Sequence, residues 1–265
     1  MSSTDMRRRL HCLSRFAVTD MGGQMKITYI HHSSFAVELD GGDKNTVLLF
    51  DYFNGELPEW DKDCALYVFA SHKHFDHFSK KIFDLATKYP DTTFILAKET
   101  RMNEKYMDRW NIPLEARSRI NYVHKNEEYD FGSLHVTTLT STDSGVAFIV
   151  ECQNKTIYHA GDLNWWAWQD DEKAHHMEKA FKNEIDKRDR SFVVDAAFLP
   201  LDIRLEGGFY KGFDYYMRRW DIVKAFPMHC WGRFDAIDRL LEMDISEGYR
   251  NRVVRITKDG ESWIM

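Results

Sequence analysis

One short segment places three imidazoles and a carboxylate directly after an apolar run. The run ALYVFA has the composition of a strand buried on both faces, and the segment SHKHFDHFS follows it at once. His72 and His74 are two residues apart, so extended backbone directs both side chains to the same side. Asp76 and His77 follow where the chain turns into the next element. Imidazole nitrogen and carboxylate oxygen are ligands of zinc and similar ions. The segment therefore predicts a metal site, with the first pair on one ion and the second pair on another.

The composition limits the class of protein. The chain has 265 residues, of which 43% are hydrophobic and 14% aromatic, enough for a large buried core. The formal net charge of −6 argues against a protein that coats nucleic acid. The four cysteines are scattered without a CxxC pair, as in a reduced, cytoplasmic protein, and no apolar run has transmembrane length. We expect a small-molecule substrate, no nucleic-acid or membrane partner, and room for a homodimer or hexamer.

The strand pattern begins at Met25. It opens the segment MKITYI, which is typical of a strand, whereas residues 1–24 show no such pattern and no secretory signal. No linker-like composition interrupts the rest of the chain. We therefore expect a peripheral N-terminal extension at 1–24 and a single domain at 25–265.

The remaining pattern alternates clusters of strands with helices, twice over. Strands are predicted at 25–32, 34–39, 46–53, 65–71, 92–97, 134–141, 145–152, 155–161, 192–200, 224–229 and 252–257. Helices are predicted at 79–89, 99–110, 171–188, 213–223 and 233–243. This order predicts an α/β (α+β) protein in which two sheets lie face to face with helices outside.

The order HxHxDH resembles the signature of the metallo-β-lactamase superfamily, and two later segments extend the resemblance. That family also has a strand ending in Gly-Asp, matched here by Asp162 in TIYHAGDLNWW, and a strand ending in histidine, matched by His229 in AFPMHCW. The resemblance runs from about Met25 to the C-terminus. It implies an αββα four-layer sandwich, the metallo-β-lactamase fold, with the metal ligands on loops along one edge of the sheets.

The resemblance also implies how the ligands are shared between two ions. His72 and His74 would hold the first ion, and Asp162 would bridge both ions. The second ion would be held by three further side chains, namely Asp76, His77 and His229.

One departure from the family pattern concerns the first ion. The family usually supplies a third histidine from a turn before a glycine and a strand, but the corresponding turn here, TSTDSGVAFIV, contains none. Thr142 stands near the expected place, and Asp143 is the nearest residue able to ligate; it is either a ligand or a turn residue. Together with HHSSFAVEL and LLFDYF, this departure resembles the branch of the sugar-phosphate (ascorbate-6-phosphate) lactonases.

The implied chemistry is hydrolysis by a metal-bridging hydroxide. Two divalent ions, in the first place zinc, with manganese or iron as alternatives, would ionise water and polarise the bond that is cleaved. Asp76 would be the catalytic carboxylate that accepts the proton. We expect a metal-dependent hydrolase acting on an ester or lactone bond of a small metabolite. The alternatives are a phosphodiesterase acting on a nucleotide or phospholipid, and a non-catalytic member that only binds metal.

Residues around the expected site have two interpretations each. Asp51, at the end of TVLLFD, either orients a ligand imidazole or bonds to local backbone. His32 is more typical of a core or surface histidine than of a site residue. Four tryptophans flank two ligand segments, where they either form a wall of a substrate pocket or belong to the core below; they are Trp165, Trp166, Trp168 and Trp231.

Overall fold

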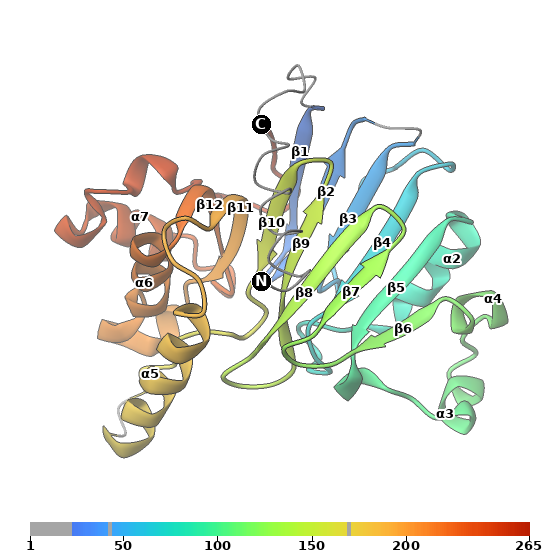
Figure 1. Ribbon diagram of the computed structural model, residues 1–265, viewed down its shortest axis with the longest axis horizontal. Helices are drawn as coiled ribbons and strands as arrows, with labels where there is room; N and C mark the ends of the chain where they lie inside the picture. The colour runs from blue at the N-terminus through green and yellow to red at the C-terminus, as the bar shows by residue number, and fades with distance from the viewer. Residues whose placement is uncertain (1–22, 42–43, 169–170) are drawn as a thin grey trace, which may run out of the picture.

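The computed structural model describes residues 23–41, 44–168 and 171–265, and two β-sheets lie face to face within it (Figure 1). The first sheet has the strand order β13-β1-β2-β3-β4-β5-β6, and the second has the order β12-β11-β10-β9-β8-β7. Helices cover the outer faces. The predicted αββα sandwich of the metallo-β-lactamase fold is confirmed.

In the first sheet β3, β4, β5 and β6 are parallel, whereas β1 pairs antiparallel with both β2 and β13, and β2 with β3. Its strands are β1 (Met25–His31), β2 (Ser34–Leu39), β3 (Thr46–Phe50), β4 (Ala65–Ala70), β5 (Thr92–Ala97), β6 (Ile120–Val123) and β13 (Ser262–Ile264). In the second sheet β7 to β10 form an antiparallel meander, and β10, β11 and β12 are parallel. Its strands are β7 (Glu128–Phe131), β8 (Leu134–Thr140), β9 (Val146–Cys152), β10 (Lys155–His159), β11 (Val193–Pro200) and β12 (Asp221–Met228).

The helices form two groups. Beside β5 and β6 in Figure 1 lie α2 (Leu85–Lys88), α3 (Glu104–Arg109) and α4 (Leu114–Arg117). Beside β11 and β12 lie α5 (Asp171–Ile185), α6 (Lys211–Arg219) and α7 (Asp235–Glu242). Short 3-10 turns are η2 (Lys80–Asp84), η3 (Lys98–Thr100), η4 (Ile203–Gly208), η5 (Asp244–Ser246) and η6 (Arg250–Arg252).

Aromatic side chains fill the space between the sheets. Phe35 of β2 stacks on Phe198 of β11 with ring centroids 4.2 Å apart, and Phe69 of β4 meets Phe148 of β9 edge to face at 5.2 Å. All four rings are fully buried. Because large aromatic rings bury the most apolar area per residue, these pairs hold the two sheets in a fixed relation. The loops at the sheet edge are positioned by that relation.

Several predicted elements differ from the structure. The helix predicted at 79–89 is η2 followed by the single turn α2, and the one at 99–110 is divided between η3 and α3. The helix predicted at 213–223 ends at Arg219, because Trp220 adopts extended backbone and donates its buried indole N–H to the carbonyl of Ile185. β6 and β7 were not predicted, since their strands are short and only partly buried.

The end of the chain also differs from the prediction. The segment 252–257 was expected to be the closing strand, yet it makes only one isolated bridge, between Ala225 and Val253. Its first residue, Arg252, belongs to the tight turn η6. The closing strand is β13, which returns to β1 in the first sheet.

Two further expectations concern the N-terminal extension and membrane-spanning segments. β1 begins at Met25, whereas residues 1–22 of the expected extension lie outside the described residues. Within the described ranges no helix has both the length and the apolar character needed to cross a membrane.

Candidate metal centre

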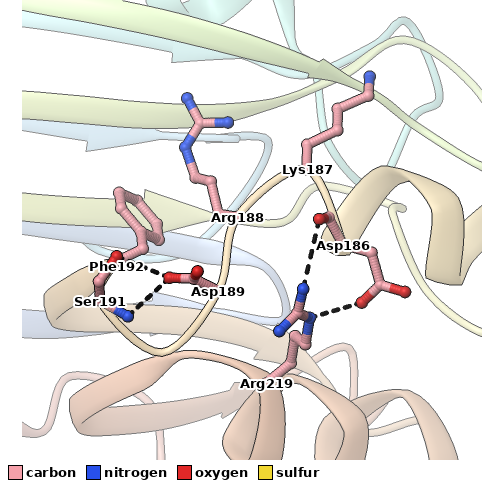
Figure 2. A pocket seen from close by; sticks show the side chains of 7 residues that line it. All are labelled: Asp186, Lys187, Arg188, Asp189, Ser191, Phe192 and Arg219. Atoms are coloured by element: carbon pink, nitrogen blue, oxygen red, sulfur yellow. Dashed lines mark hydrogen bonds and ion pairs between the residues drawn. The ribbon is translucent and has the colours of Figure 1, made fainter.

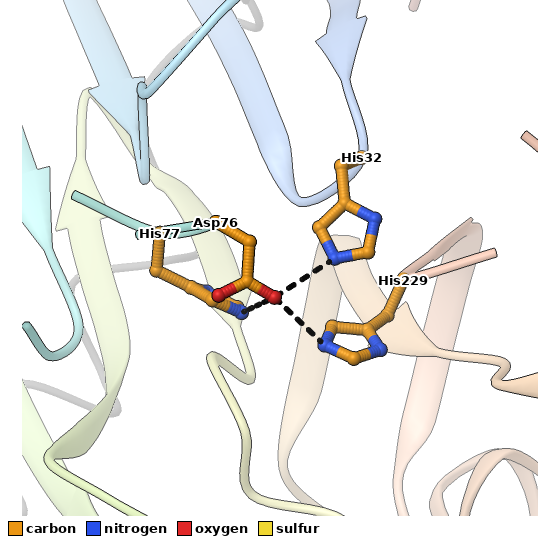
Figure 3. A group of neighbouring side chains, drawn as sticks. All are labelled: His32, Asp76, His77 and His229. Atoms are coloured by element: carbon orange, nitrogen blue, oxygen red, sulfur yellow. Dashed lines mark ion pairs between the residues drawn. The ribbon is translucent and has the colours of Figure 1, made fainter. Parts of the chain in front are cut away.

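The predicted ligands come from loops at one edge of the sandwich. His72 to His77 follow β4, Asp162 follows β10, and His229 follows β12. The carboxyl ends of parallel strands meet at the same edge of a sheet, which brings distant segments together there. His32 reaches the same place from the turn between β1 and β2 (Figure 3).

The first cluster consists of His72, His74 and Asp162. The His72 Nε2 atom lies 3.3 Å from Oδ2 of Asp162, and both side chains are buried. The rings of His72 and His74 are edge to face with centroids 4.4 Å apart, and the His74 side chain is 45% exposed. The first cluster is therefore open to solvent on the His74 side.

The second cluster gathers three imidazoles around Asp76 (Figure 3). The Oδ2 atom of Asp76 lies 3.6 Å from Nε2 of His32, 4.0 Å from Nε2 of His77 and 3.9 Å from Nε2 of His229. Asp162 connects the clusters, because its Oδ1 lies 3.2 Å from Nε2 of His77 while its Oδ2 faces the first cluster. The structure thus brings six predicted ligands together and adds a seventh, His32.

Buried polar atoms without partners show that this group fits metal ions. The Nε2 atoms of His32, His72 and His77 and the Oδ1 atom of Asp162 are buried and have no hydrogen-bond partner in the described structure. Leaving such atoms unpaired costs about 1–3 kcal/mol each. Metal bonds of 2.0–2.2 Å in tetrahedral arrangement put donor atoms roughly 3.3–3.6 Å apart, close to the separations found here. A divalent cation would satisfy these atoms.

Asp51 holds one of the imidazoles from behind. Its carboxylate, fully buried at the end of β3, accepts hydrogen bonds from the backbone N–H of Ser71 at 2.7 Å and the Ser71 hydroxyl at 2.6 Å. It also accepts the Nδ1–H of His77 at 2.7 Å, which directs Nε2 of that ring into the cluster. Both interpretations of Asp51 are therefore realised, since it bonds to local backbone and orients a ligand imidazole.

Asp202 does the same for His229, and the sequence analysis did not single it out. The carboxylate follows β11 and accepts the Nδ1–H of His229 at 3.0 Å. Arg204 donates to the same carboxylate through Nε at 2.9 Å. Burial opposes ionisation, but the hydrogen bonds from His229 and Arg204 lower the pKa of Asp202 to about 2. No motif marks this residue, because its role depends on the neighbouring parallel strands β11 and β12.

The cluster is strongly polarised in the absence of ions. Burial disfavours the ionised form of Asp76, but the neighbouring imidazoles of His32 and His77 lower its pKa to about 2. Burial likewise disfavours protonated His77, yet Asp162 and Asp51 raise the pKa of His77 to about 10. Burial lowers the pKa of His32 to about 4, although the nearby Asp76 carboxylate acts in the opposite direction. The carboxylates are therefore ionised at neutral pH, as metal ligands and a proton acceptor must be.

His32 corrects the sequence analysis. It was interpreted as a core or surface histidine, but the structure aims its unpartnered Nε2 at Asp76. Its backbone has a φ of 55°, a conformation that L-residues rarely adopt, and its N–H is held by the Tyr29 hydroxyl at 2.8 Å. His159, by contrast, is fully paired, since Nε2 donates to the Ser33 carbonyl.

Asp143 lies at the rim rather than in either cluster. Its carboxylate is 51% exposed, and its Oδ2 is 3.8 Å from Nδ1 of His74. Thr142, at the place of the missing histidine, donates its hydroxyl to the backbone carbonyl of Asn164 at 2.7 Å and so joins this turn to the Asp162 loop. Ligation by Asp143 stays a prediction.

A cavity of about 570 Å³ opens over the clusters. Trp166 is buried and donates its indole N–H to the Asp162 carbonyl, so it supports a ligand loop from below. Trp168 and Trp231 are 48% and 41% exposed and line the cavity, together with Phe75. Trp166 lines the cavity as well while it packs in the core, and Trp165 is partly buried against the core.

Residues 26–178 match a family model described as a beta-lactamase superfamily domain. The chain belongs to the metallo-β-lactamase superfamily. A UPF0173 metal-dependent hydrolase from Nanoarchaeum equitans is 27% identical over 217 residues, which cover 77% of this chain and 83% of the relative.

Two solved structures share the fold at low sequence identity. A metallo hydrolase from Ignicoccus hospitalis, Igni18, superposes with a TM-score of 0.60 at 17% identity, covering 91% of this chain and 98% of the other. The diiron β-hydroxylase CmlA from Streptomyces venezuelae superposes with a TM-score of 0.54 at 12% identity, covering 98% of this chain and 57% of the other. The prediction of a metallo-hydrolase with this fold is confirmed at the level of the superfamily, whereas the lactonase-like branch stays a prediction.

Proposed function

We propose that this metal-dependent hydrolase cleaves an ester or lactone bond in a small metabolite, with two zinc ions bound to the clusters. The observation that carries the proposal is the set of buried, unpartnered imidazole nitrogens and carboxylate oxygens that point at one another across Asp162. Ions bound there would lower the pKa of water towards neutrality and polarise the carbonyl oxygen of a substrate.

The protein residues have distinct parts in this proposal. His72, His74 and one oxygen of Asp162 would hold the first ion. The second would be held by side chains from four loops, namely His32, Asp76, His77, His229 and Asp162. Asp76 lines the cavity with a carboxylate that is ionised at neutral pH, so it is placed to accept the proton of the attacking water.

The cavity supports a small substrate. Its volume of about 570 Å³ lies within the range of small-molecule sites, and its exposed tryptophans offer flat apolar contact. Three of the cysteines, Cys64, Cys152 and Cys230, are buried free thiols, which supports the proposed cytoplasmic location; Cys12 lies outside the described residues.

The test combines metal content with turnover. Purified protein is loaded with zinc, manganese or iron, its metal content is measured by mass spectrometry, and 4-nitrophenyl acetate, a γ-lactone and bis(4-nitrophenyl) phosphate are offered. We expect two ions per chain and chelator-sensitive hydrolysis of the ester or lactone. Asp76→Asn should lower kcat by about 10²–10⁴-fold. The matched control is Asp195→Asn, on β11, whose carboxylate accepts the backbone N–H of Thr156 and belongs to neither cluster.

The alternatives give different results in the same assay. Cleavage of the phosphodiester alone would replace the proposal with a phosphodiesterase. One ion per chain with no turnover would indicate a non-catalytic metal-binding protein.

A further inference from the structure

A second cavity lies on the other side of the ligand loop. It has a volume of about 480 Å³ and shares Phe75 with the cavity over the metal clusters. We call it the distal groove and define it by the side chains that the argument uses, which are Lys73, Phe75, Lys80, Arg101, Tyr106 and Trp110. Lys73 stands between His72 and His74, so the loop that carries the ligands also forms a wall of the groove. A ligand crossing Phe75 would reach both cavities.

The distal groove carries unbalanced positive charge. Lys73, Lys80 and Arg101 are exposed, and within the described residues none of them forms an ion pair with a carboxylate. Glu99, the one acidic residue lining this cavity, accepts the Ser144 hydroxyl at 2.6 Å and pairs with Lys125 at 3.4 Å. Its charge is therefore already balanced outside the groove. Three cations remain to attract an anion, in a chain whose net charge is negative.

The distal groove also exposes flat aromatic surface. Phe75 is 74% exposed, Tyr106 45% and Trp110 38%. The rings of Tyr106 and Trp110 lie 5.7 Å apart, and the Lys80 Nζ lies 3.0 Å from the centroid of the Trp110 ring. A cluster of exposed aromatic rings is typical of a binding surface, and a lysine stacked over a ring keeps its hydrogen-bond donors free for a ligand.

Another basic cavity provides a contrast (Figure 2). It has about 680 Å³ and also contains cations, but Arg219 pairs with Asp186 at 2.6 Å and Lys187 pairs with Glu184 at 2.6 Å. Only Phe192 among its lining residues is aromatic. Among the described cations of this cavity only Arg188 lacks an ion pair, so it offers an incoming anion one unpaired cation, whereas the distal groove offers three.

We propose that the distal groove binds a phosphate group carried on a planar, far end of the substrate. A carboxylate needs one cation, whereas a phosphate monoester carries about −1.5 to −2 charges at pH 7 and three acceptor oxygens, which suit three free cations. The planar part would lie against Phe75 and the Tyr106–Trp110 pair, while the bond to be cleaved reaches the metal clusters. The part of this inference that concerns the substrate rests on the proposed function. The part that concerns phosphate binding rests on the residues of the distal groove alone.

The binding test uses phenyl phosphate as the probe. Its affinity is measured by calorimetry for metal-loaded and for chelator-treated protein. The variant Lys73→Gln/Lys80→Gln/Arg101→Gln should bind about 10- to 100-fold more weakly, because three charge contacts are lost, and wild-type affinity should fall as salt is added. The matched control removes the same charges at exposed residues outside the groove, in Lys62→Gln/Lys105→Gln/Arg109→Gln, and should bind like the wild type. Circular dichroism verifies the fold of each variant.

Two results overturn the proposal. One is equal affinity of the wild type and the groove variant for phenyl phosphate. The other is binding that disappears on chelator treatment, because the probe would then sit on the metal ions. For the substrate, 4-acetoxyphenyl phosphate should have a KM about tenfold below that of phenyl acetate, and the groove variant should lose this preference.

The two proposals fail in distinguishable ways. If neither ester is hydrolysed but phenyl phosphate still binds chelator-treated protein through the groove, the ester hydrolase is wrong and the phosphate site stands. If both esters are hydrolysed with equal KM and the groove variant binds phenyl phosphate like the wild type, the phosphate site is wrong and the hydrolase stands.

Discussion

Asp51 tests whether the carboxylates behind the ligands set the metal affinity. One of its oxygens accepts the Ser71 backbone N–H, and the other accepts both the Ser71 hydroxyl and Nδ1–H of His77. In Asp51→Asn one of these oxygens becomes an NH₂ group. In either orientation of the amide, this group faces a donor of Ser71 or His77. A buried donor is then left without an acceptor, and the His77 ring is no longer held towards the cluster.

The expected magnitude follows from these contacts. Replacing the carboxylate behind a ligand histidine lowers metal affinity by about 10–100-fold, which corresponds to about 1.4–2.8 kcal/mol. The unpaired donor should lower the free energy of unfolding of metal-free protein by about 1–3 kcal/mol. The second ion should be affected most, because Asp51 bonds to His77 and to no other ligand ring at hydrogen-bond distance.

The assay is zinc competition against a chromogenic chelator, with urea unfolding of metal-free protein beside it. Asp195→Asn is again the control, because its side chain is 25% exposed and accepts a backbone N–H away from the clusters. If Asp51→Asn binds both ions as tightly as the wild type while remaining folded, the reasoning that this carboxylate positions His77 is refuted.

Three further results are expected. His32→Ala should weaken binding of the second ion at least about tenfold by removing an inward-facing nitrogen, and two tightly bound ions in equilibrium dialysis would contradict that role. Burial opposes protonation of His77, but the neighbouring carboxylates raise its pKa from 6.5 to about 10. Protonated His77 should therefore stabilise the metal-free protein fully below about pH 6.5, and this stabilisation should be lost as the pH rises towards 10. A free energy of unfolding in urea that stays constant over this pH range would argue against it. Gly145→Ala should lower the free energy of unfolding by about 2–4 kcal/mol more than Gly232→Ala. Both glycines have a φ of 70°, but only at Gly145 would an added Cβ lie 1.9 Å from the Ser71 carbonyl oxygen. Equal decreases of the melting temperature in the two variants would refute the clash.

The fold was predictable where local pattern and burial agree. The strands that fill the sandwich are mostly buried segments rich in apolar and β-branched residues, and they lie where that pattern placed them. The helices near η2 and α3 were overextended, because apolar residues at helical spacing occur equally in a tight 3-10 turn that packs on a sheet. The strand expected at 252–257 did not form because a strand needs a partner in register over several residues, and here only Val253 bridges Ala225 of the edge strand β12.

The site shows the same division between local pattern and tertiary contact. The residue types and spacing from His72 to His77 were enough by themselves to predict candidate metal ligands after a buried strand, because three imidazoles and a carboxylate in one short segment are typical of a metal site. Only the tertiary structure decided that His32 and Asp202 belong with them. Their positions follow from a left-handed backbone at one turn and from the parallel pairing of β11 and β12, and both depend on contacts between residues far apart in the chain.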